Sequence, residues 1–221
     1  MVVQSGRDGT LHGDRRGACR TRDNCPVPLI LASGSPRRRE ILDGLMLDFK
    51  VETAGIDETV NDGESVEESA LRLAAEKGDA VADKNPDSLV ISADTIVSLD
   101  GAAIGKPADR DDAREILLRL GGRTHEVITA LAFARRCEKL RLSVSCRSRI
   151  TLHPLNGEII DNYLDTGEYA DKAGGYAIQG YGKILVKSYE GSLSNIIGLP
   201  VRTLLSFIVS YGVERMPWRD G

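Results

Sequence analysis

One short stretch of the sequence combines residue types that are suited to binding an anion. Apolar residues from Leu29 run into Ser33-Gly34-Ser35, and Pro36 and three arginines follow. This order predicts a buried strand, a tight turn and a helix that Ser35 caps and Pro36 begins. Because a helix N-terminus attracts anions and arginine suits multidentate contacts with phosphate, we expect a phosphate site here rather than a solvated basic turn.

The second candidate for chemistry is an acidic residue. The apolar stretch from Leu89 to Ala93 predicts a buried strand that ends at Asp94, where α/β proteins often hold catalytic or metal-binding groups. On its own, Asp94 could equally be a turn residue that caps the sheet. A phosphate-binding turn nearby favours a metal-binding role, because Mg²⁺ binds one or two carboxylates together with phosphate oxygens. Asp57 and Glu58 could supply further carboxylates to such a site. The alternative is that they belong to a solvated loop without a role in binding.

Two lysines and one glutamine complete the set of candidates. Lys77 falls in a predicted helix, where most lysines face solvent, and Lys106 lies in a rigid setting between a glycine and a proline. Gln179 stands in a Gly-rich loop, where its amide can pair with a base edge or stabilise the loop itself. His125, at the start of a predicted strand, is interpreted as a structural residue rather than a base.

These residues must be positioned by alternating helices and strands. Apolar periodicity, caps and turn residues predict helices at 36–45, from the capping box at Ser65 past Val81, and at 109–120, 156–166 and 200–211. Strands are predicted at 29–32, 49–53, 89–93 continuing through 96–99, 102–104, 125–134, 140–152, 184–186 and 195–197. Because both crossovers and hairpins occur, we expect an α/β fold with a mixed sheet.

Composition limits the class of protein. The chain has 221 residues, 41% of them hydrophobic and 28% charged, which is typical of a globular protein. Its net charge of −4 argues against nucleic acid as a partner, and no apolar run reaches membrane-spanning length. The four cysteines match no zinc or disulfide framework, which favours a reducing, cytoplasmic location.

Three segments are expected along the chain. Residues 1–28 are rich in Arg, Gly and Asp and are predicted to be a poorly ordered extension, rather than a targeting or nucleic-acid-binding arm. Residues 29–212 form the predicted domain, and residues 213–221 form a C-terminal tail.

Taken together, the motifs resemble the Maf family of nucleotide pyrophosphatases. They occur in the family's order between residues 29 and 211, and each is weak alone. The matching segments are Leu31–Arg38, Lys77 in its helix, Ala93–Thr95, Gly105–Pro107, Gly122–Thr129, Asp171–Gly180 and Gly198–Pro200.

The resemblance implies a fold and a reaction. The expected fold is that of inosine-triphosphatase-type enzymes, an elongated mixed β-sheet flanked by helices, with two lobes and a central cleft. The expected activity is hydrolysis of a nucleoside triphosphate to the monophosphate and pyrophosphate, with a divalent metal, Mg²⁺ or Mn²⁺. A house-cleaning or cell-division-linked role and a homodimer are also implied.

The resemblance also suggests roles for individual residues. By position, Ser33, Arg37 and Arg38 resemble the phosphate-binding turn, and Glu58, Lys77, Asp94 and Lys106 resemble the family's catalytic positions. Gln179 resembles the glutamine of the branch that acts on dTTP and UTP, whereas the 7-methyl-GTP branch carries a Glu-containing loop.

The mechanistic hypothesis is attack of water on the α-phosphorus. Glu58 and Asp94 would hold the metal and help to deprotonate the water, while Arg37, Arg38 and the two lysines neutralise the triphosphate. The alternatives are a non-hydrolysing nucleotide-binding regulator of cell division and a nucleic-acid-binding protein that uses the arginine-rich N-terminus.

Overall fold

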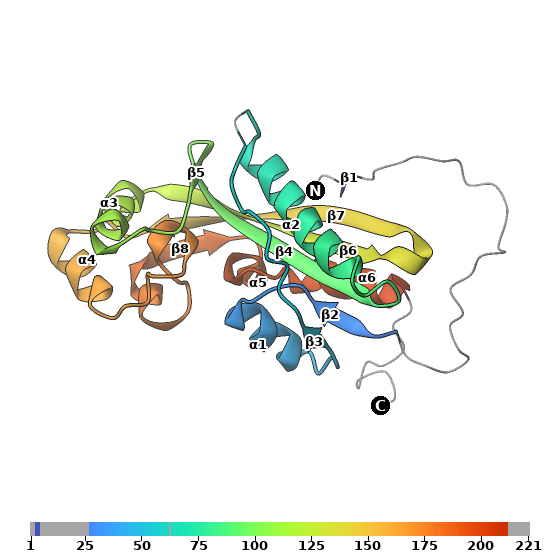
Figure 1. Cartoon of the computed structure of the whole chain (residues 1–221). Coiled ribbons are helices and arrows are strands. Elements are labelled where there is room, and N and C mark those ends of the chain that lie inside the picture. Colours follow the sequence, from blue (N-terminus) through green and yellow to red (C-terminus); the bar gives the residue numbers. More distant parts are fainter. Residues whose placement is uncertain (1–2, 5–26, 62, 212–221) are drawn as a thin grey trace.

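The computed structural model describes residues 3–4, 27–61 and 63–211. Their fold is built on one long mixed β-sheet with helices around it (Figure 1). Within these residues the sheet has eight strands in the order β1-β7-β6-β4-β2-β3, with β5 beside β4 and β8 beside β7. The strands are β1 Val3–Gln4, β2 Leu29–Leu31, β3 Lys50–Val51, β4 Leu89–Leu99, β5 Ala102–Ile104, β6 Thr124–Arg135, β7 Leu140–Leu152 and β8 Val186–Glu190. The predicted mixed α/β fold is confirmed.

Both kinds of strand pairing occur in the sheet. Strand β2 runs parallel to β3 and β4, whereas β4, β6 and β7 pair antiparallel along most of their length. The predicted hairpin between β4 and β5 is confirmed, and Asp100 and Gly101 at its tip have φ of 52° and 84°. Asp and Gly tolerate this left-handed conformation, which matches the twist of the flanking strands.

Helices cover both faces and one end of the sheet. They are α1 Pro36–Gly44, α2 Val66–Ala82, α3 Arg110–Leu120, α4 Gly157–Leu164, α5 Leu193–Ile197 and α6 Val201–Tyr211, with short 3₁₀ turns η1 Arg136–Glu138, η2 Ala173–Gly175 and η3 Gly180–Leu185. The capping box predicted at Ser65 and Glu68 is present at the start of α2. The expected cap of α1 is wrong in detail: Ser35 is the N-cap residue, but its side chain makes no capping hydrogen bond.

The apolar core divides between the two ends of the sheet. At one end α3 and α4 pack on β4, β6 and β7, with Leu117 and Tyr163 among the most buried residues (Figure 1). At the other end β2, α1 and α6 enclose a second cluster around Leu31 and Phe133. Helix α2 covers one face of the long strands between them. The two end clusters on one sheet correspond to the two lobes that were expected.

Three predictions about local structure are wrong. Asp94 does not end a strand, because β4 continues through it and pairs with β6 as far as Ser98. The strand predicted at 195–197 is helix α5, which Ser192 caps and a left-handed Gly198 ends. The strand predicted at 184–186 is the end of η3 followed by β8. Strand propensity misleads here because tertiary pairing and caps determine the outcome.

The predicted extension and tail lie almost entirely outside the described residues. Of residues 1–28, only Val3, Gln4, Val27 and Pro28 are described, and Val3–Gln4 pairs antiparallel with β7. Order in the remaining residues of the extension, and in residues 213–221, stays a prediction. In the described part of the chain, no helix combines the length and apolarity that crossing a bilayer requires.

Candidate active site

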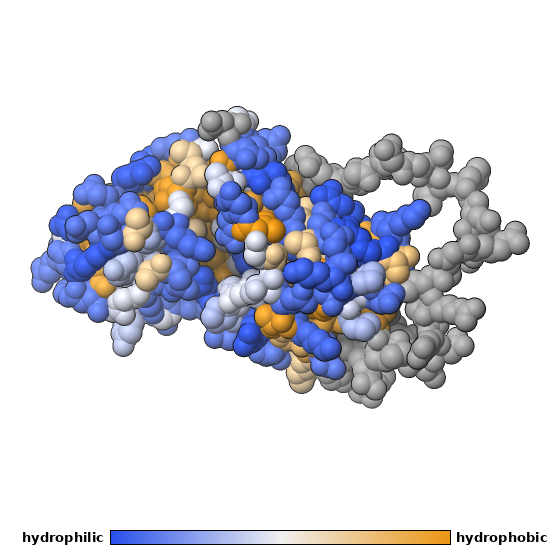
Figure 2. Space-filling model, in the orientation of Figure 1, coloured by the Kyte–Doolittle hydropathy of each residue, from blue (hydrophilic) through white to orange (hydrophobic). Residues whose placement is uncertain are grey.

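A cleft of about 470 Å³ opens between the two ends of the sheet. Figure 2 shows this hollow between hydrophilic parts of the surface, with hydrophobic residues visible inside it. Strand β2 accompanies β4 only from Leu89 to Ile91, so β4 loses this neighbour just before Asp94. The chain leaves β2 there through the turn to α1, and the cleft lies at this carboxyl end of the parallel pair, where α/β sheets bind ligands.

The turn from β2 to α1 positions a serine and an arginine. Ser33 Oγ accepts a hydrogen bond from the Ser35 amide at 3.2 Å and another from Arg38 Nη1 at 3.1 Å. Arg38 also donates from Nη2 to Thr95 Oγ1 at 3.0 Å and from Nε to the Gly198 carbonyl at 2.8 Å. These bonds use three of the five N–H groups of the guanidinium, which leaves two for a ligand.

Arg38 lacks a direct carboxylate partner among the described residues. Desolvation lowers the pKa of its guanidinium below the ordinary value, and this effect exceeds the opposing influence of Asp94. A cation held by neutral hydrogen-bond acceptors gains from the arrival of an anion. Arg38 is therefore built to meet a negatively charged group in the cleft.

Lys77 joins the two predicted catalytic carboxylates. It is 7% exposed on α2, and its Nζ lies 2.7 Å from Asp94 Oδ1 and 2.9 Å from Glu58 Oε1. Asp94 is itself only 6% exposed on β4. A buried lysine between two carboxylates is not the solvent-facing residue that its helical setting alone would favour, and it fixes both acids at one wall of the cleft.

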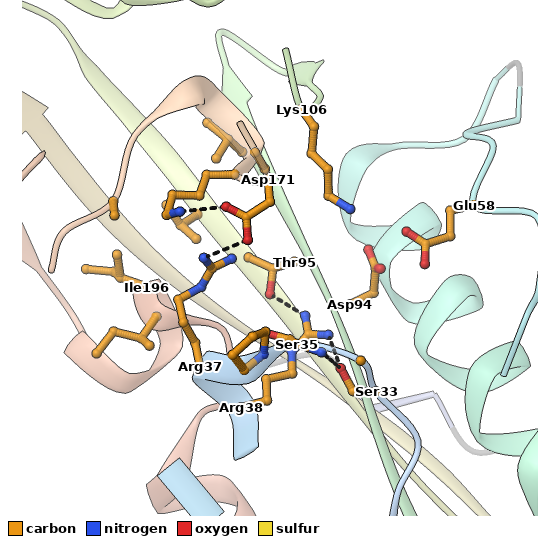
Figure 3. Close-up of a pocket in the computed structure, with 18 of the residues that line it drawn as sticks. Ser33, Ser35, Arg37, Arg38, Glu58, Asp94, Thr95, Lys106, Asp171 and Ile196 are labelled. Atoms are coloured by element: carbon orange, nitrogen blue, oxygen red, sulfur yellow. Dashed lines mark hydrogen bonds and ion pairs between the residues drawn. The ribbon is translucent and has the colours of Figure 1, made fainter. Parts of the chain in front are cut away.

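Lys106 reaches toward the same acids from the loop after β5 (Figure 3). It makes no hydrogen bond or ion pair with any described residue, which leaves its ammonium group open to a ligand. Burial acts to raise the pKa of Glu58, but the hydrogen bond from Lys77 and the charges of Lys77, Lys106 and Arg38 hold it below its ordinary value. Glu58 is thus ionised at neutral pH.

Arg37 faces the Gly-rich loop on the opposite side of the cleft. Its Nη1 lies 3.5 Å from Asp171 Oδ2, and Asp171 Oδ1 accepts a hydrogen bond from Lys172 Nζ at 2.6 Å. The hydrogen bond from Lys172 lowers the pKa of Asp171, and Arg37 adds to the effect. The Asp171 carboxylate thus lies between Arg37 of one lobe and Lys172 of the other. The Arg37 side chain remains 28% exposed and lines the cleft.

Gln179 lines the cleft from the end of the Gly-rich loop. The loop is fixed by Glu168, whose carboxylate accepts from the Tyr181 and Gly182 amides, both at 2.9 Å. The Gln179 amide has no hydrogen-bond partner in the described part of the chain. The loop-stabilising alternative is therefore not what the structure has, and both amide atoms are available to a ligand.

The cleft is positively charged although the whole chain is acidic. Its described lining contains five cations, Arg37, Arg38, Lys77, Lys106 and Lys172, against three carboxylates, Glu58, Asp94 and Asp171. The chain as a whole carries a net charge of −4. A surplus of cations around a hollow of this kind favours a polyanionic ligand.

Glu58 and Asp94 are the described residues that fit a divalent metal. Lys77 contacts one oxygen of each carboxylate, Oε1 and Oδ1, so the second oxygen of each is available for a cation. No cluster of three or more His, Cys, Asp or Glu side chains suited to a metal occurs among the residues described. Mg²⁺ fits a two-carboxylate site of this kind because it takes its other ligands from phosphates and water.

All eight residues predicted for the site line the same cleft: Ser33, Arg37, Arg38, Glu58, Lys77, Asp94, Lys106 and Gln179. Arg39 is exposed, and Asp57 instead accepts hydrogen bonds from Thr59 in a local turn. His125 is buried, with Nε2 2.6 Å from the Tyr176 hydroxyl, which agrees with its predicted structural role.

Sequence reasoning assigned no role to Thr95, Asp171 or Lys172, which also line the cleft. Thr95 accepts from Arg38, and Asp171 pairs with both Arg37 and Lys172. All three lie within segments that resemble the family, Ala93–Thr95 and Asp171–Gly180, as a hydroxyl directly after Asp94 and a charged pair at the start of the Gly-rich loop. Neither indicates a role until the lobes are brought together.

Comparison with known proteins identifies the family of this chain. The profile of the Maf family, described as "Maf-like protein", matches residues 28–211. The chain is 44% identical over 191 residues to a "dTTP/UTP pyrophosphatase" of Myxococcus xanthus (strain DK1622), covering 86% of this chain and 95% of that protein. It is 47% identical to a protein of the same name from Desulfotalea psychrophila (strain LSv54 / DSM 12343), covering 86% and 97%.

A solved structure shares the fold at low sequence identity. The Ham1 protein of Staphylococcus aureus matches with a TM-score of 0.51 and 13% identity, over 83% of this chain and 99% of that one. This likeness concerns the fold alone, and it agrees with the elongated sheet and flanking helices that were expected.

Proposed function

Because this chain belongs to the Maf family, we propose that it is a nucleoside triphosphate pyrophosphatase that hydrolyses dTTP and UTP to the monophosphate and pyrophosphate. The observation that carries the proposal is the cationic cleft around the Glu58–Lys77–Asp94 cluster, since a triphosphate supplies the missing negative charge. The names and the 44% and 47% identities of the two relatives support the same activity.

In this proposal the triphosphate lies between the α1 turn and the carboxylates. Arg37 and Arg38 neutralise phosphate oxygens from the α1 side, and Ser33 holds Arg38 in place. Lys106 neutralises the charge that develops on the leaving pyrophosphate. Such preorganised cations stabilise the transition state because they need no reorganisation as charge moves.

The residues of the carboxylate cluster handle the attacking water. Water oxygen bonds to the α-phosphorus, the bond from that phosphorus to the bridging oxygen breaks, and the electron pair leaves with pyrophosphate. Asp94 accepts the proton of the water, and Lys77 holds Asp94 and Glu58 beside each other by contacting both. We assign Mg²⁺ or Mn²⁺ to Glu58 and Asp94, where it would neutralise charge on phosphate oxygens.

The base is proposed to bind at the other end of the cleft, near Gln179. The free amide of Gln179 presents an NH₂ donor group beside a carbonyl acceptor, and uracil and thymine present carbonyl acceptors beside an N–H donor. Val127, Ile150 and Ile196 supply apolar walls for a flat ring in the same cleft. This combination supports a pyrimidine and its modified forms.

A nucleotide screen tests the proposal directly. The full-length protein is mixed with dTTP, UTP and other triphosphates, with magnesium, with manganese or with a chelator, and the products are separated by chromatography. We expect monophosphate and pyrophosphate from dTTP and UTP, and loss of turnover with the chelator. Tight dTTP binding without turnover would instead support the non-hydrolysing regulator.

Three further expectations remain predictions alongside this proposal. They are the homodimer, the cytoplasmic location and the house-cleaning or cell-division-linked role. Light scattering of the purified protein tests the first.

A further inference from the structure

A chain of two hydroxyl groups, Thr95 at the cleft and Thr129 behind it, connects Arg38 to helix α5. Arg38 Nη2 donates to Thr95 Oγ1 at 3.0 Å, Thr95 Oγ1 lies 3.0 Å from Thr129 Oγ1, and Thr129 donates to the Asn195 carbonyl at 2.9 Å. Thr129 is fully buried, at 0% exposure in the middle of β6. It does not line the cleft, so nothing in the proposed reaction uses it directly.

The direction of each hydrogen bond follows from the groups involved. A carbonyl oxygen only accepts, so the single proton of Thr129 is committed to Asn195. Thr95 must therefore donate its own proton to Thr129. The oxygen of Thr95 is then oriented to accept from Arg38. Each link fixes the rotation of the next hydroxyl.

Helix α5 anchors both ends of this arrangement. Asn195 is fully buried, and its side-chain amide donates to the Val127 carbonyl at 3.1 Å and to Ser148 Oγ at 3.0 Å. Three residues later, the Gly198 carbonyl accepts directly from Arg38 Nε at 2.8 Å. The guanidinium is thus held at Nε by the end of α5 and at Nη2 by the hydroxyl chain.

We propose that Thr129 is a positioning residue of the reaction, which orients Arg38 toward the triphosphate through Thr95. This inference rests on the proposed function, because Arg38 is taken to bind substrate phosphate. Without the hydroxyl of Thr129, which is fully buried, the proton of Thr95 loses its acceptor. A donor that faces an apolar side chain without a partner is unfavourable, so Thr95 turns toward another acceptor and the guanidinium loses one of its three fixed contacts.

The test is a double-mutant cycle on kcat/KM for UTP with magnesium. Thr129→Val removes the hydroxyl while keeping the side-chain shape, and we expect kcat/KM to fall about tenfold. Thr129→Ser keeps the hydroxyl and should stay within about threefold of the unsubstituted protein. In an Arg38→Ala background, Thr129→Val should change kcat/KM by less than about twofold, because the residue it acts through is gone.

A matched control is available on the same strand. Thr124 at the start of β6 forms a similar bond to Thr151, with 2.8 Å between the hydroxyl oxygens, on the surface and outside the cleft. Thr124→Val should leave kcat/KM unchanged. Circular dichroism melting of every variant separates loss of fold from loss of positioning. If Thr129→Val does not fold, Thr129→Cys, with its weak thiol donor, takes its place in the cycle.

The outcomes are distinct. An active unsubstituted protein with an equally active, folded Thr129→Val variant would overturn the inference alone. If Thr129→Val lowers kcat/KM equally with Arg38 present and in the Arg38→Ala background, the inference is also overturned, since Thr129 would then act independently of Arg38. An unsubstituted protein that releases no UMP from UTP and no dTMP from dTTP would overturn the proposed function, and the inference would fall with it.

Discussion

Replacing Asp94 by Asn tests the carboxylate cluster with the smallest change of shape. Asparagine has nearly the same volume and keeps an oxygen for Lys77, which lies 2.7 Å from Asp94 Oδ1. It removes the negative charge, and with it the acceptor for the proton of water and one of the two carboxylates for a metal. The hydrogen-bond geometry therefore survives while the chemistry is lost.

The expected effects on activity and stability differ greatly in size. Loss of a general base or of one preorganised electrostatic contact reduces kcat by about 100- to 1000-fold, or ~3 to 4 kcal/mol. Removing one partner from a buried ion pair can cost ~3 to 5 kcal/mol. Here Lys77 keeps Glu58 at 2.9 Å, and Asn still accepts from it, so we expect a loss of ~1 to 2 kcal/mol. That lowers the melting temperature by about 3 to 6 °C in a domain of this size.

The assay measures dTMP released from dTTP at saturating magnesium, beside a melting curve. Asp100→Asn is the matched control, because Asp100 lies at the tip of the β4–β5 hairpin, is 71% exposed and pairs with Arg123. Asparagine accepts the left-handed backbone at that position, so activity and stability should hardly change. A folded Asp94→Asn protein with a third or more of the original kcat would refute the assignment of Asp94.

Three further predictions follow from the same contacts. Arg37→Ala should raise KM about tenfold by removing a charged contact to phosphate, whereas exposed Arg39→Ala should leave initial-rate kinetics unchanged. Burial lowers the pKa of His125 from 6.5 to about 4, so the unfolded chain binds the proton more readily. The free energy of unfolding should therefore fall, by up to ~3 kcal/mol, as the pH drops from 6.5 to 4. Urea unfolding at a series of pH values should show a smaller fall for His125→Gln than for the unsubstituted protein. Gln179→Glu should lower kcat/KM for UTP and dTTP about tenfold, because a carboxylate only accepts hydrogen bonds; equal rates with the unsubstituted protein would exclude base recognition there.

Much of the local structure could be predicted because its causes lie close together in the chain. The capping box at Ser65 and Glu68, and the Asp100-Gly101 turn, depend on neighbours within a few residues. One wrong prediction also concerns a short local segment. Residues 195–197 have strand-like composition, yet Ser192 and Gly198 cap them as a helix that packs beside β6 and β7.

The position of Asp94 shows where pattern reasoning stopped. An apolar run followed by an acidic residue predicts a buried strand that ends at the acid. The sequence contains no sign that strand pairing continues beyond it. Strand β6 pairs with β4 from Val90 to Ser98 and carries it through the acid. Asp94 still lies at the cleft, because the parallel partner β2 ends at Leu31, opposite Ile91 and three residues before Asp94 along β4.

By itself, the sequence determined the residue types of the site, the basic turn at the start of α1 and the family that the motifs resemble. Only the tertiary structure decided how these charges are shared. Lys77 meets Asp94 from 17 positions away, and Arg38 reaches Gly198 across 160. Such partners depend on which strands pair and which helices cover them, because burial makes each charge require a counter-charge or a hydrogen-bond acceptor nearby. The same packing turns Thr129, an ordinary strand residue in the sequence, into the buried support of Arg38.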